Sequence, residues 1–298
     1  MGKSLFRKDG TAQGVAKQRL IESLAKPGKR VIYDPFAHYF VFGTTLIKIM
    51  GHKLSVWLTK LMTPGFHEHL ISRTRFIDDL IEGQEGIEQY VILGAGYDSR
   101  PYRLKLPPTM KIFEVDQKEV QDLKKEKLPA DTSNLNNVTF ISIDFNTQTI
   151  TERFLEAGFN PSKPTVFTLE GVSQYITKEA VDDTFKEIAE LTKGEKTIFY
   201  ISYVDQLLKN NPEQCFGTGY KNATKKANLI QNLAAKVGEP WISFYTHEEL
   251  KTMLAKHGFA ITDDKALEDL NEKYFTPVGR TIPEHHLFNL ERNLVAVK

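Results

Sequence analysis

The 298-residue sequence predicts an α/β fold with a mostly parallel sheet, helices on both of its faces and an N-terminal helical cap. Two observations predict it. Residues 11–82 carry helical periodicity throughout, whereas short apolar runs alternate with helical patterns farther along the chain. We therefore expect a helical cap at residues 1–88 and a sheet-containing core at residues 89–298.

The predicted cap contains one helix that ends near Pro27-Gly28 and a long apolar stretch from Tyr39 to Leu61. Glycine, histidine and lysine residues interrupt this stretch, so it lacks the run of roughly 18 uncharged residues that a membrane span requires. We expect it to form helix packed on the core, and we expect no membrane partner.

Five short apolar runs predict the strands of the sheet. The first run ends at Leu93 and passes at once into Gly94-Ala95-Gly96, which is typical of a buried parallel strand that enters a tight turn. Between later runs, Lys178 to Thr192 has the periodicity of an amphipathic helix. The five runs are Tyr90 to Leu93, Ile112 to Asp116, Val138 to Asp144, Thr165 to Glu170 and Thr197 to Ser202.

The C-terminal part predicts two helices and two weaker strands. The helices cover Ala223 to Val237 and Thr246 to His257, and Thr246 with Glu249 has the spacing of a capping box. The strands lie near Phe259 to Thr262 and Leu294 to Val297.

Charge and cysteine content exclude several classes of protein. Lys and Arg total 39 against 38 Asp and Glu, without a long block of one sign, so we expect no nucleic-acid partner. Cys215 is the single cysteine and can form neither an internal disulfide nor a cysteine-based zinc site. The first ten residues lack the apolar region of a secretory signal, and we expect a cytoplasmic protein.

Histidine spacing gives no metal motif. His67 and His69 are two residues apart, and His285 adjoins His286, but neither pair has the i, i+4 spacing or the partner acids of a metal site. We expect no bound metal.

The glycine loop points to an adenosine cofactor. Its glycines allow the backbone to approach a ligand closely, and Asp116 ends the next run, where an acid can accept hydrogen bonds from two ribose hydroxyls. Ser99 stands where a dinucleotide motif has its third glycine, and Asp98 would repel a pyrophosphate. The alternative is that Gly94 and Gly96 only make a tight turn.

Several further motifs follow one another along the chain. They are Thr11-Ala12 with Val15-Ala16 and Arg19, Asp34-Pro35 with Ala37, Ser72 to Asp78, Leu93 to Arg100 with Tyr102 to Leu104, Phe113 to Asp116, and Leu169 to Val172 with Tyr175. In this order they resemble the leucine carboxyl methyltransferase-like family of S-adenosylmethionine-dependent methyltransferases, which includes polyketide O-methyltransferases. The resemblance covers nearly the whole chain and implies a Rossmann-like class I methyltransferase with a seven-stranded sheet. Residues 205–241 match weakly, and there we expect the wall of the acceptor pocket.

The resemblance also implies the cofactor site. Arg73 would pair with the methionyl carboxylate through two parallel hydrogen bonds, with Arg75 as the alternative. Glu170 would lie near the amino group, and Tyr175 near the transferred methyl. Lys17 or Arg19 would close over the cofactor from the first helix. The other implied cofactor residues are Gly94, Ala95, Gly96, Asp116, Gln117, Asp144, Phe145 and Gly171.

The sequence thus predicts an O-methyltransferase that uses S-adenosyl-L-methionine and acts on a carboxylate or hydroxyl of a small molecule. The alternatives are a protein C-terminal carboxyl methyltransferase, a nucleotide-dependent dehydrogenase and a non-catalytic cofactor-binding protein. A hydroxyl acceptor would need a base, for which the candidates are Tyr175, Tyr203 and His247. The sequence leaves the acceptor and the oligomeric state open.

Overall fold

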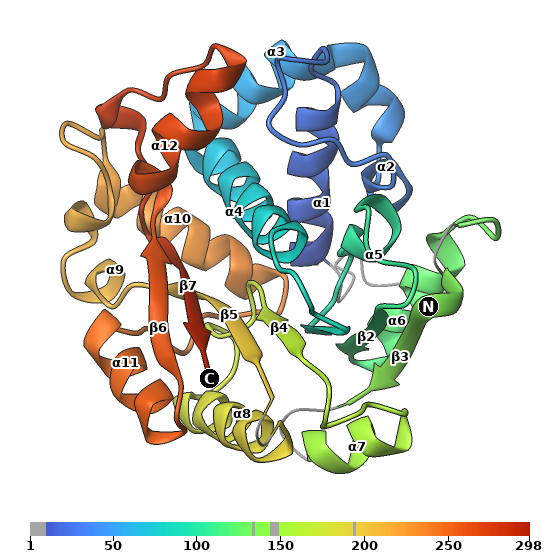
Figure 1. Cartoon of the computed structure of the whole chain (residues 1–298). Coiled ribbons are helices and arrows are strands. Elements are labelled where there is room, and N and C mark those ends of the chain that lie inside the picture. The colour runs from blue at the N-terminus through green and yellow to red at the C-terminus, as the bar shows by residue number, and fades with distance from the viewer. Residues whose placement is uncertain (1–9, 133–134, 144–148, 193–194) are drawn as a thin grey trace, which may run out of the picture.

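The computed structural model describes residues 10–132, 135–143, 149–192 and 195–298 (Figure 1). Within these residues, seven strands form one sheet in the order β3-β2-β1-β4-β5-β7-β6. β1 to β5 pair in parallel, whereas β7 runs antiparallel to both of its neighbours. The prediction of a mostly parallel seven-stranded sheet is confirmed. The strands are β1 (Gln89–Leu93), β2 (Lys111–Asp116), β3 (Val138–Ser142), β4 (Thr165–Leu169), β5 (Thr197–Val204), β6 (Ala260–Lys265) and β7 (Glu291–Val297).

Helices cover both faces of the sheet (Figure 1). One face carries α4 and α12, and the other carries α7, α8 and α11. The cap comprises α1 (Gly10–Ser23), α2 (Ala37–Phe40), α3 (Thr44–Met62) and α4 (Phe66–Glu82). The remaining α-helices are α5 (Arg100–Arg103), α6 (Lys118–Lys127), α7 (Ile150–Glu156), α8 (Lys178–Leu191), α9 (Leu207–Asn210), α10 (Ala223–Lys236), α11 (His247–Lys256) and α12 (Leu267–Phe275). Short 3₁₀ helices are η1 (Leu135–Asn137), η2 (Pro212–Cys215), η3 (Thr276–Val278) and η4 (Glu284–His286).

The predicted helix starts and strand positions match the structure closely. Thr246 is the N-cap of α11, and its hydroxyl accepts the backbone N–H of Glu249 at 3.1 Å. The apolar face of α8 that the periodicity predicted is buried, including Val181, Phe185 and Ile188. Asp144, the predicted end of the third run, lies outside the described residues.

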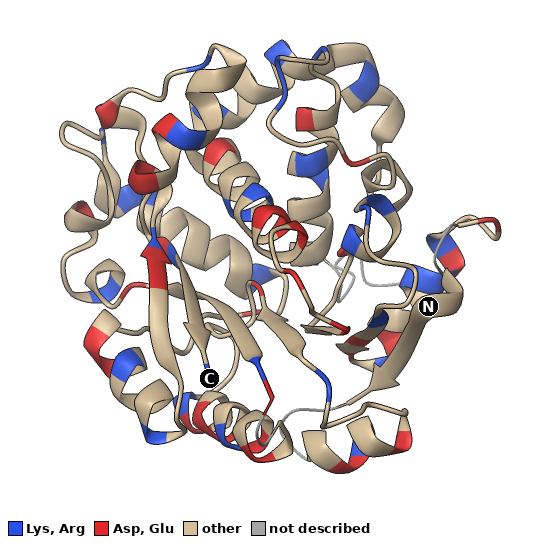
Figure 2. Cartoon of the chain, viewed as in Figure 1, with Lys and Arg blue, Asp and Glu red and all other residues tan. Residues whose placement is uncertain are grey.

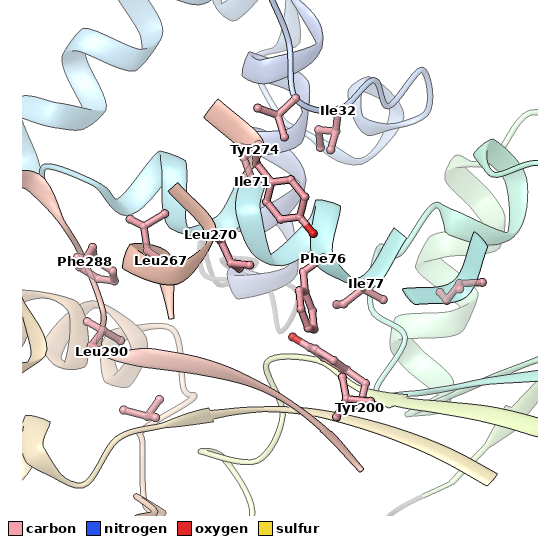
Figure 3. Close-up of a cluster of buried hydrophobic side chains, with 14 of the residues drawn as sticks. Ile32, Ile71, Phe76, Ile77, Tyr200, Leu267, Leu270, Tyr274, Phe288 and Leu290 are labelled. Atoms are coloured by element: carbon pink, nitrogen blue, oxygen red, sulfur yellow. The ribbon is translucent and has the colours of Figure 1, made fainter. Parts of the chain in front are cut away.

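The cap shares a hydrophobic core with the sheet. Side chains of α4 and α12 lie over the strands in Figure 3, where Phe76 points toward Tyr200 of β5. Their ring centroids are 6.2 Å apart, and both side chains are buried. Ile71 of α4 and Leu270 of α12 belong to the same buried cluster. Burial of these apolar side chains against one another fixes the cap on the sheet.

The expectation that Tyr39 to Leu61 packs on the core is only half right. Ile47 and Val56 of α3 are buried, but most of the large apolar side chains of this segment face solvent. A kink at Gly51, with φ of 68°, divides α3 into two halves, and both halves expose apolar residues. None of the helices in the described part of the chain is long and apolar enough to cross a membrane.

Candidate cofactor and acceptor site

The loop after β1 needs glycine at two positions. Gly94 has φ of 71° and Gly96 has φ of 44°, a region of backbone space that disfavours side chains. A Cβ atom on Gly94 would lie 2.4 Å from Cγ2 of Val172, so a larger residue would clash. The N–H groups of Gly94 and Ala95 donate to the carbonyl of Val115 at 2.8 and 3.0 Å. The loop is therefore held at the carboxyl end of β2.

Asp116 joins the end of β2 to this loop. Its Oδ2 atom accepts the N–H of Gly96 at 2.6 Å, and its Oδ1 atom accepts the N–H of Gln117 at 2.7 Å. Burial raises the pKa of Asp116, and the two amides offset part of that rise. A carboxylate oxygen can accept more than one hydrogen bond, so both oxygens keep capacity for ligand hydroxyls.

Arg73, Glu170 and Arg100 form a buried ion-pair chain beside the loop. Nε of Arg73 donates to Oε1 of Glu170 at 2.8 Å, and Nη1 of Arg100 donates to Oε2 at 2.7 Å. Burial by itself would raise the pKa of Glu170, but Arg100 and Arg73 lower it to about 2. Glu170 is therefore ionised at neutral pH, and its carboxylate is already partly engaged.

Arg73 is engaged from a second side as well. Its Nη1 atom donates to both oxygens of Glu291 in β7, each at 2.8 Å. Nε and Nη1 thus have carboxylate partners, and Nη2 is the nitrogen for which the described residues provide no hydrogen-bond acceptor. In this arrangement Arg73 can donate to a ligand through Nη2. The two parallel hydrogen bonds to a carboxylate that the resemblance implies would require one of the existing ion pairs to open. The alternative residue, Arg75, is half exposed and pairs with Asp79 at 2.7 Å.

The two candidate cations of α1 occupy different positions. Arg19 is buried, with Nε on Asp34 at 2.8 Å and Nη2 on the carbonyl of Tyr97 at 2.5 Å. It thereby ties the cap to the glycine loop. Lys17 is exposed and has no ion pair within the described residues. Both residues line the same cavity.

A cavity of about 920 Å³ joins these groups at the carboxyl ends of β1 and β4. This is the topological switch point of the sheet, where open α/β proteins bind ligands. One wall holds Gly94, Ala95, Gly96, Asp116, Gln117, Glu170 and Gly171. Much of the remaining lining is apolar and comes from α1, α3, α4 and α10 together with the loop after α10, including Val15, Leu58, Met62, Ile230, Leu233 and Trp241.

Tyr175 also lines the cavity. Burial raises the pKa of its phenol, and the neighbouring side chains of Trp241 and Thr11 offset part of that rise. The phenol therefore stays protonated at neutral pH and can donate a hydrogen bond. Gly171, with φ of 64°, donates its N–H to Oγ of Ser202 at 2.7 Å.

Two of the candidate bases do not lie at the cavity. Tyr203 donates to Oδ2 of Asp264 at 2.9 Å, and Nδ1 of His247 lies 2.5 Å from the same oxygen. Neither residue lines the cavity. Asp144 and Phe145, two of the cofactor residues that the resemblance implies, lie outside the described residues.

Sequence reasoning missed His69 as a cavity residue. His69 is buried on α4 and lines the cavity, and its Nε2 lies 2.7 Å from Oε2 of Glu291. Its Nδ1 is buried with no hydrogen-bond partner in the described chain. In a neutral imidazole ring, one nitrogen carries the hydrogen and the other is a hydrogen-bond acceptor. If Nε2 donates its hydrogen to Glu291, Nδ1 is the acceptor. No local spacing could have revealed this, because the two residues come from opposite ends of the chain.

One cluster in the cap has potential metal ligands. Glu22, His52 and His67 bring one ligand atom each to within 4.8 Å of one another. Oε2 of Glu22 lies 3.0 Å from Nε2 of His67 and 3.4 Å from Nε2 of His52. Arg280 donates to both oxygens of the same carboxylate, however. Its positive charge already balances Glu22 and would oppose a second cation.

The fold and the site define a class. A sheet with this strand order, a glycine loop after β1 and an acid at the end of β2 define a class I methyltransferase of the kind that uses S-adenosylmethionine. Residues 12–189 match the family described as Leucine carboxyl methyltransferase. The chain belongs to the leucine carboxyl methyltransferase family.

Two relatives illustrate the match. A protein of Rhodococcus jostii, provisionally named an S-adenosyl-L-methionine-dependent methyltransferase, is 35% identical over 295 residues, which cover 97% of this chain and 95% of the relative. A Bacillus subtilis protein with the same type of name is 30% identical over 194 residues. That match covers 64% of this chain and spans 60% of the relative.

Two solved structures share the fold. A DUF574-family protein from Streptomyces avermitilis superposes with a TM-score of 0.58 at 13% identity, covering 94% of this chain and 96% of that one. A Thermobifida fusca protein, provisionally described as a methyltransferase, has a TM-score of 0.55 at 15% identity, with 94% of each chain covered.

Proposed function

We propose that this protein transfers the methyl group of S-adenosylmethionine to a carboxylate oxygen of a small, largely apolar molecule. The single observation that carries the proposal is that one cavity of about 920 Å³ is lined both by polar groups at the strand ends and by apolar side chains of the cap and α10. Small-molecule sites typically have volumes of about 300–1,000 Å³. A cofactor and an acceptor can therefore share the cavity.

The residues of the polar wall fit the cofactor. Asp116 would accept hydrogen bonds from ribose hydroxyls, and the ionised Glu170 would face the methionyl amino group. Lys17 and Nη2 of Arg73 would attract the methionyl carboxylate. When bound, S-adenosylmethionine supplies a methyl group on a positively charged sulfur atom.

The protonation states support a carboxylate acceptor. Tyr175 keeps its proton at neutral pH. Neighbouring arginines lower the pKa of Glu170 and of Glu291, so both carboxylates are ionised and are weak bases. An ionised carboxylate is nucleophilic without loss of a proton, so the site would need only to orient it. Attraction between this anion and the sulfonium favours the approach, and an apolar wall that excludes water strengthens the attraction.

His69 supports one second candidate, transfer to a hydroxyl or phenol. His69 lines the cavity, its buried Nδ1 has no hydrogen-bond partner among the described residues, and Glu291 orients the ring through Nε2. Such a pair is a suitable general base for an acceptor that must lose a proton. The same cavity would then act on a different oxygen.

Cofactor binding is tested first, by titrating the protein with S-adenosylhomocysteine and with NAD in a calorimeter. We expect binding of S-adenosylhomocysteine and none of NAD. Tight binding of NAD alone would identify a dehydrogenase and overturn the proposal. Binding without turnover across many acceptors would instead indicate a non-catalytic cofactor-binding protein.

The acceptor atom is tested with labelled methyl groups. We expect an amphiphilic carboxylic acid to gain a label that mild base releases as methanol, because esters hydrolyse under those conditions. A label that resists base in the wild type and is lost in His69→Gln would establish the hydroxyl alternative. Labelling of a protein C-terminus in preference to small acids would identify a protein carboxyl methyltransferase.

A further inference from the structure

The outward face of α3 is the largest set of exposed apolar side chains in the described structure. Leu54, Trp57, Leu58, Leu61 and Met62 follow one stripe of the second half, at 40 to 58% exposure. The first half and the residues before it add Phe42, Leu46 and Ile49 at 92, 61 and 78%. Soluble proteins rarely leave so many large apolar side chains of one segment exposed without a partner.

The Lys, Arg, Asp and Glu positions of α3 and the residues around it are all basic. Between Asp34 and Glu68 the sequence contains Lys48, Lys53 and Lys60 and no acidic residue. Lys60 pairs with Glu68 at 3.0 Å, whereas Lys48 and Lys53 are exposed and have no acidic partner among the described residues. In Figure 2, α3 along the top edge of the molecule carries basic but no acidic positions.

The apolar face continues into the cavity. Leu58 and Met62 are exposed at 40 and 57% and also line the cavity. Met50, Ser55 and Thr59 of the same helix line it as well. The cavity therefore opens beside the exposed stripe. A molecule held by a partner that covers α3 would be close to the entrance of the cavity.

In place of the sequence-based expectation of no membrane partner, we propose that α3 is an interfacial helix that docks this protein on an anionic lipid bilayer. An apolar stripe with tryptophan, flanked by lysines and without acids, is typical of helices that lie in the plane of a membrane surface. Anionic headgroups would be negatively charged partners for Lys48 and Lys53, which have no acidic partner among the described residues. A second copy of the chain fits less well, because a two-fold contact through α3 would bring these lysines together with no acid in the segment to pair them.

The proposal is independent of the reaction, although it also gives the site a supply of amphiphilic acceptors. The test therefore measures vesicle binding of the full chain without cofactor or acceptor. Cosedimentation uses vesicles of phosphatidylcholine alone and of phosphatidylcholine with phosphatidylglycerol in equal parts. We expect binding to the mixed vesicles at low salt, and weaker binding as salt screens the charges.

Two double variants divide the apolar and electrostatic contributions. Lys48→Glu with Lys53→Glu should weaken binding to the mixed vesicles by about thirtyfold or more. Each lysine near such a surface raises the affinity for the membrane by about five- to sixfold. Ile49→Ser with Trp57→Ser should weaken binding to both kinds of vesicle. Matched controls at exposed positions outside α3, Lys111→Glu with Lys186→Glu and Leu155→Ser with Leu207→Ser, should bind as the wild type does.

A tryptophan signal gives an independent readout. Trp57 is 54% exposed, so its fluorescence should shift to the blue on the mixed vesicles, and the shift should disappear in Trp57→Phe. Equal binding by the α3 variants and the controls would overturn the proposal. So would a stable dimer that depends on Ile49 and Trp57 while the protein ignores vesicles, because α3 would then be a contact between copies.

Discussion

Nη1 of Arg73 in α4 donates to both carboxylate oxygens of Glu291 in β7, each at 2.8 Å, across 218 residues of sequence. The contact joins the cap to the antiparallel strand of the sheet at the floor of the cavity. Both side chains are almost entirely buried. Nε of the same guanidinium binds Glu170, so one arginine balances two carboxylates in the cavity wall.

Replacement of Arg73 should therefore destabilise the protein as well as weaken cofactor binding. Arg73→Ala leaves Glu170 without one of its two cations and Glu291 without its arginine partner, and breaking a buried pair costs about 3–5 kcal/mol. Arg73→Lys keeps the charge and should cost less. Thermal and urea unfolding measure the change. Arg75→Ala, which removes a half-exposed pair with Asp79, is the control and should change stability by less than about 1 kcal/mol. Equal stability of the two alanine variants would contradict this account.

Asp116→Ala should weaken binding of S-adenosylhomocysteine by about 1.5–3 kcal/mol, the usual effect of removing a charged hydrogen-bond partner. The loss has two sources, because the carboxylate also positions the N–H of Gly96. Calorimetry gives the affinity, and circular dichroism checks the fold. Asp122→Asn, at an exposed position of α6, should bind as the wild type does. An unchanged affinity in Asp116→Ala would remove Asp116 from the cofactor site.

Stability should fall in acid through the same ion pairs. Arginines lower the pKa of Glu170 from 4.5 to about 2 and also lower the pKa of Glu291. A carboxylate whose pKa is lower in the folded state contributes its full stability above the unfolded pKa, and that contribution is lost as pH falls toward the folded pKa. We expect the unfolding free energy contributed by these groups to decline from about pH 4.5 down to pH 2. Glu170→Gln should flatten part of that decline, and an identical acid profile in the variant would contradict the assignment.

Chelator should leave cofactor binding and methyl transfer unchanged. The described residues that line the cavity include no cluster of metal ligands, and Arg280 already balances the carboxylate in the Glu22, His52 and His67 cluster. Turnover before and after dialysis against EDTA, with elemental analysis of the protein, measures this. A loss of activity or stability that added Zn²⁺ restores, and that is absent in His52→Ala, would instead make the cluster a metal site.

The strands and several of the helices could be predicted because their signals are local. An apolar run that ends at Leu93 before a glycine turn has few alternatives to a buried parallel strand. Thr246 and Glu249 fix a helix start through contacts within one turn. The antiparallel direction of β7 was not predicted, because strand direction depends on how the chain returns to the sheet after α12.

The grouping of the glycine loop with the acid was also predictable in part. Gly94, Gly96 and Asp116 line one cavity, because the end of β1 and the end of β2 are neighbours in a parallel sheet, and their role in cofactor binding stays a prediction. Lys17 and Arg19 could not be told apart by sequence, since both lie on the same helix. Both line the cavity, but the fold distinguishes them by burying Arg19 against Asp34 and leaving Lys17 exposed and without an ion pair in the described part of the chain.

The sequence alone determined the order of strands and helices, the glycine loop and the acid that follows it, because these depend on residues close together in the chain. Only the tertiary structure decided which charged side chains form ion pairs and which apolar side chains remain exposed to solvent. Arg73 finds Glu291, and His69 finds the same carboxylate, through packing of the cap on the sheet. The apolar stripe of α3 faces outward for a related reason: periodicity shows that a helix has an apolar face, whereas only the neighbouring elements decide whether that face is buried.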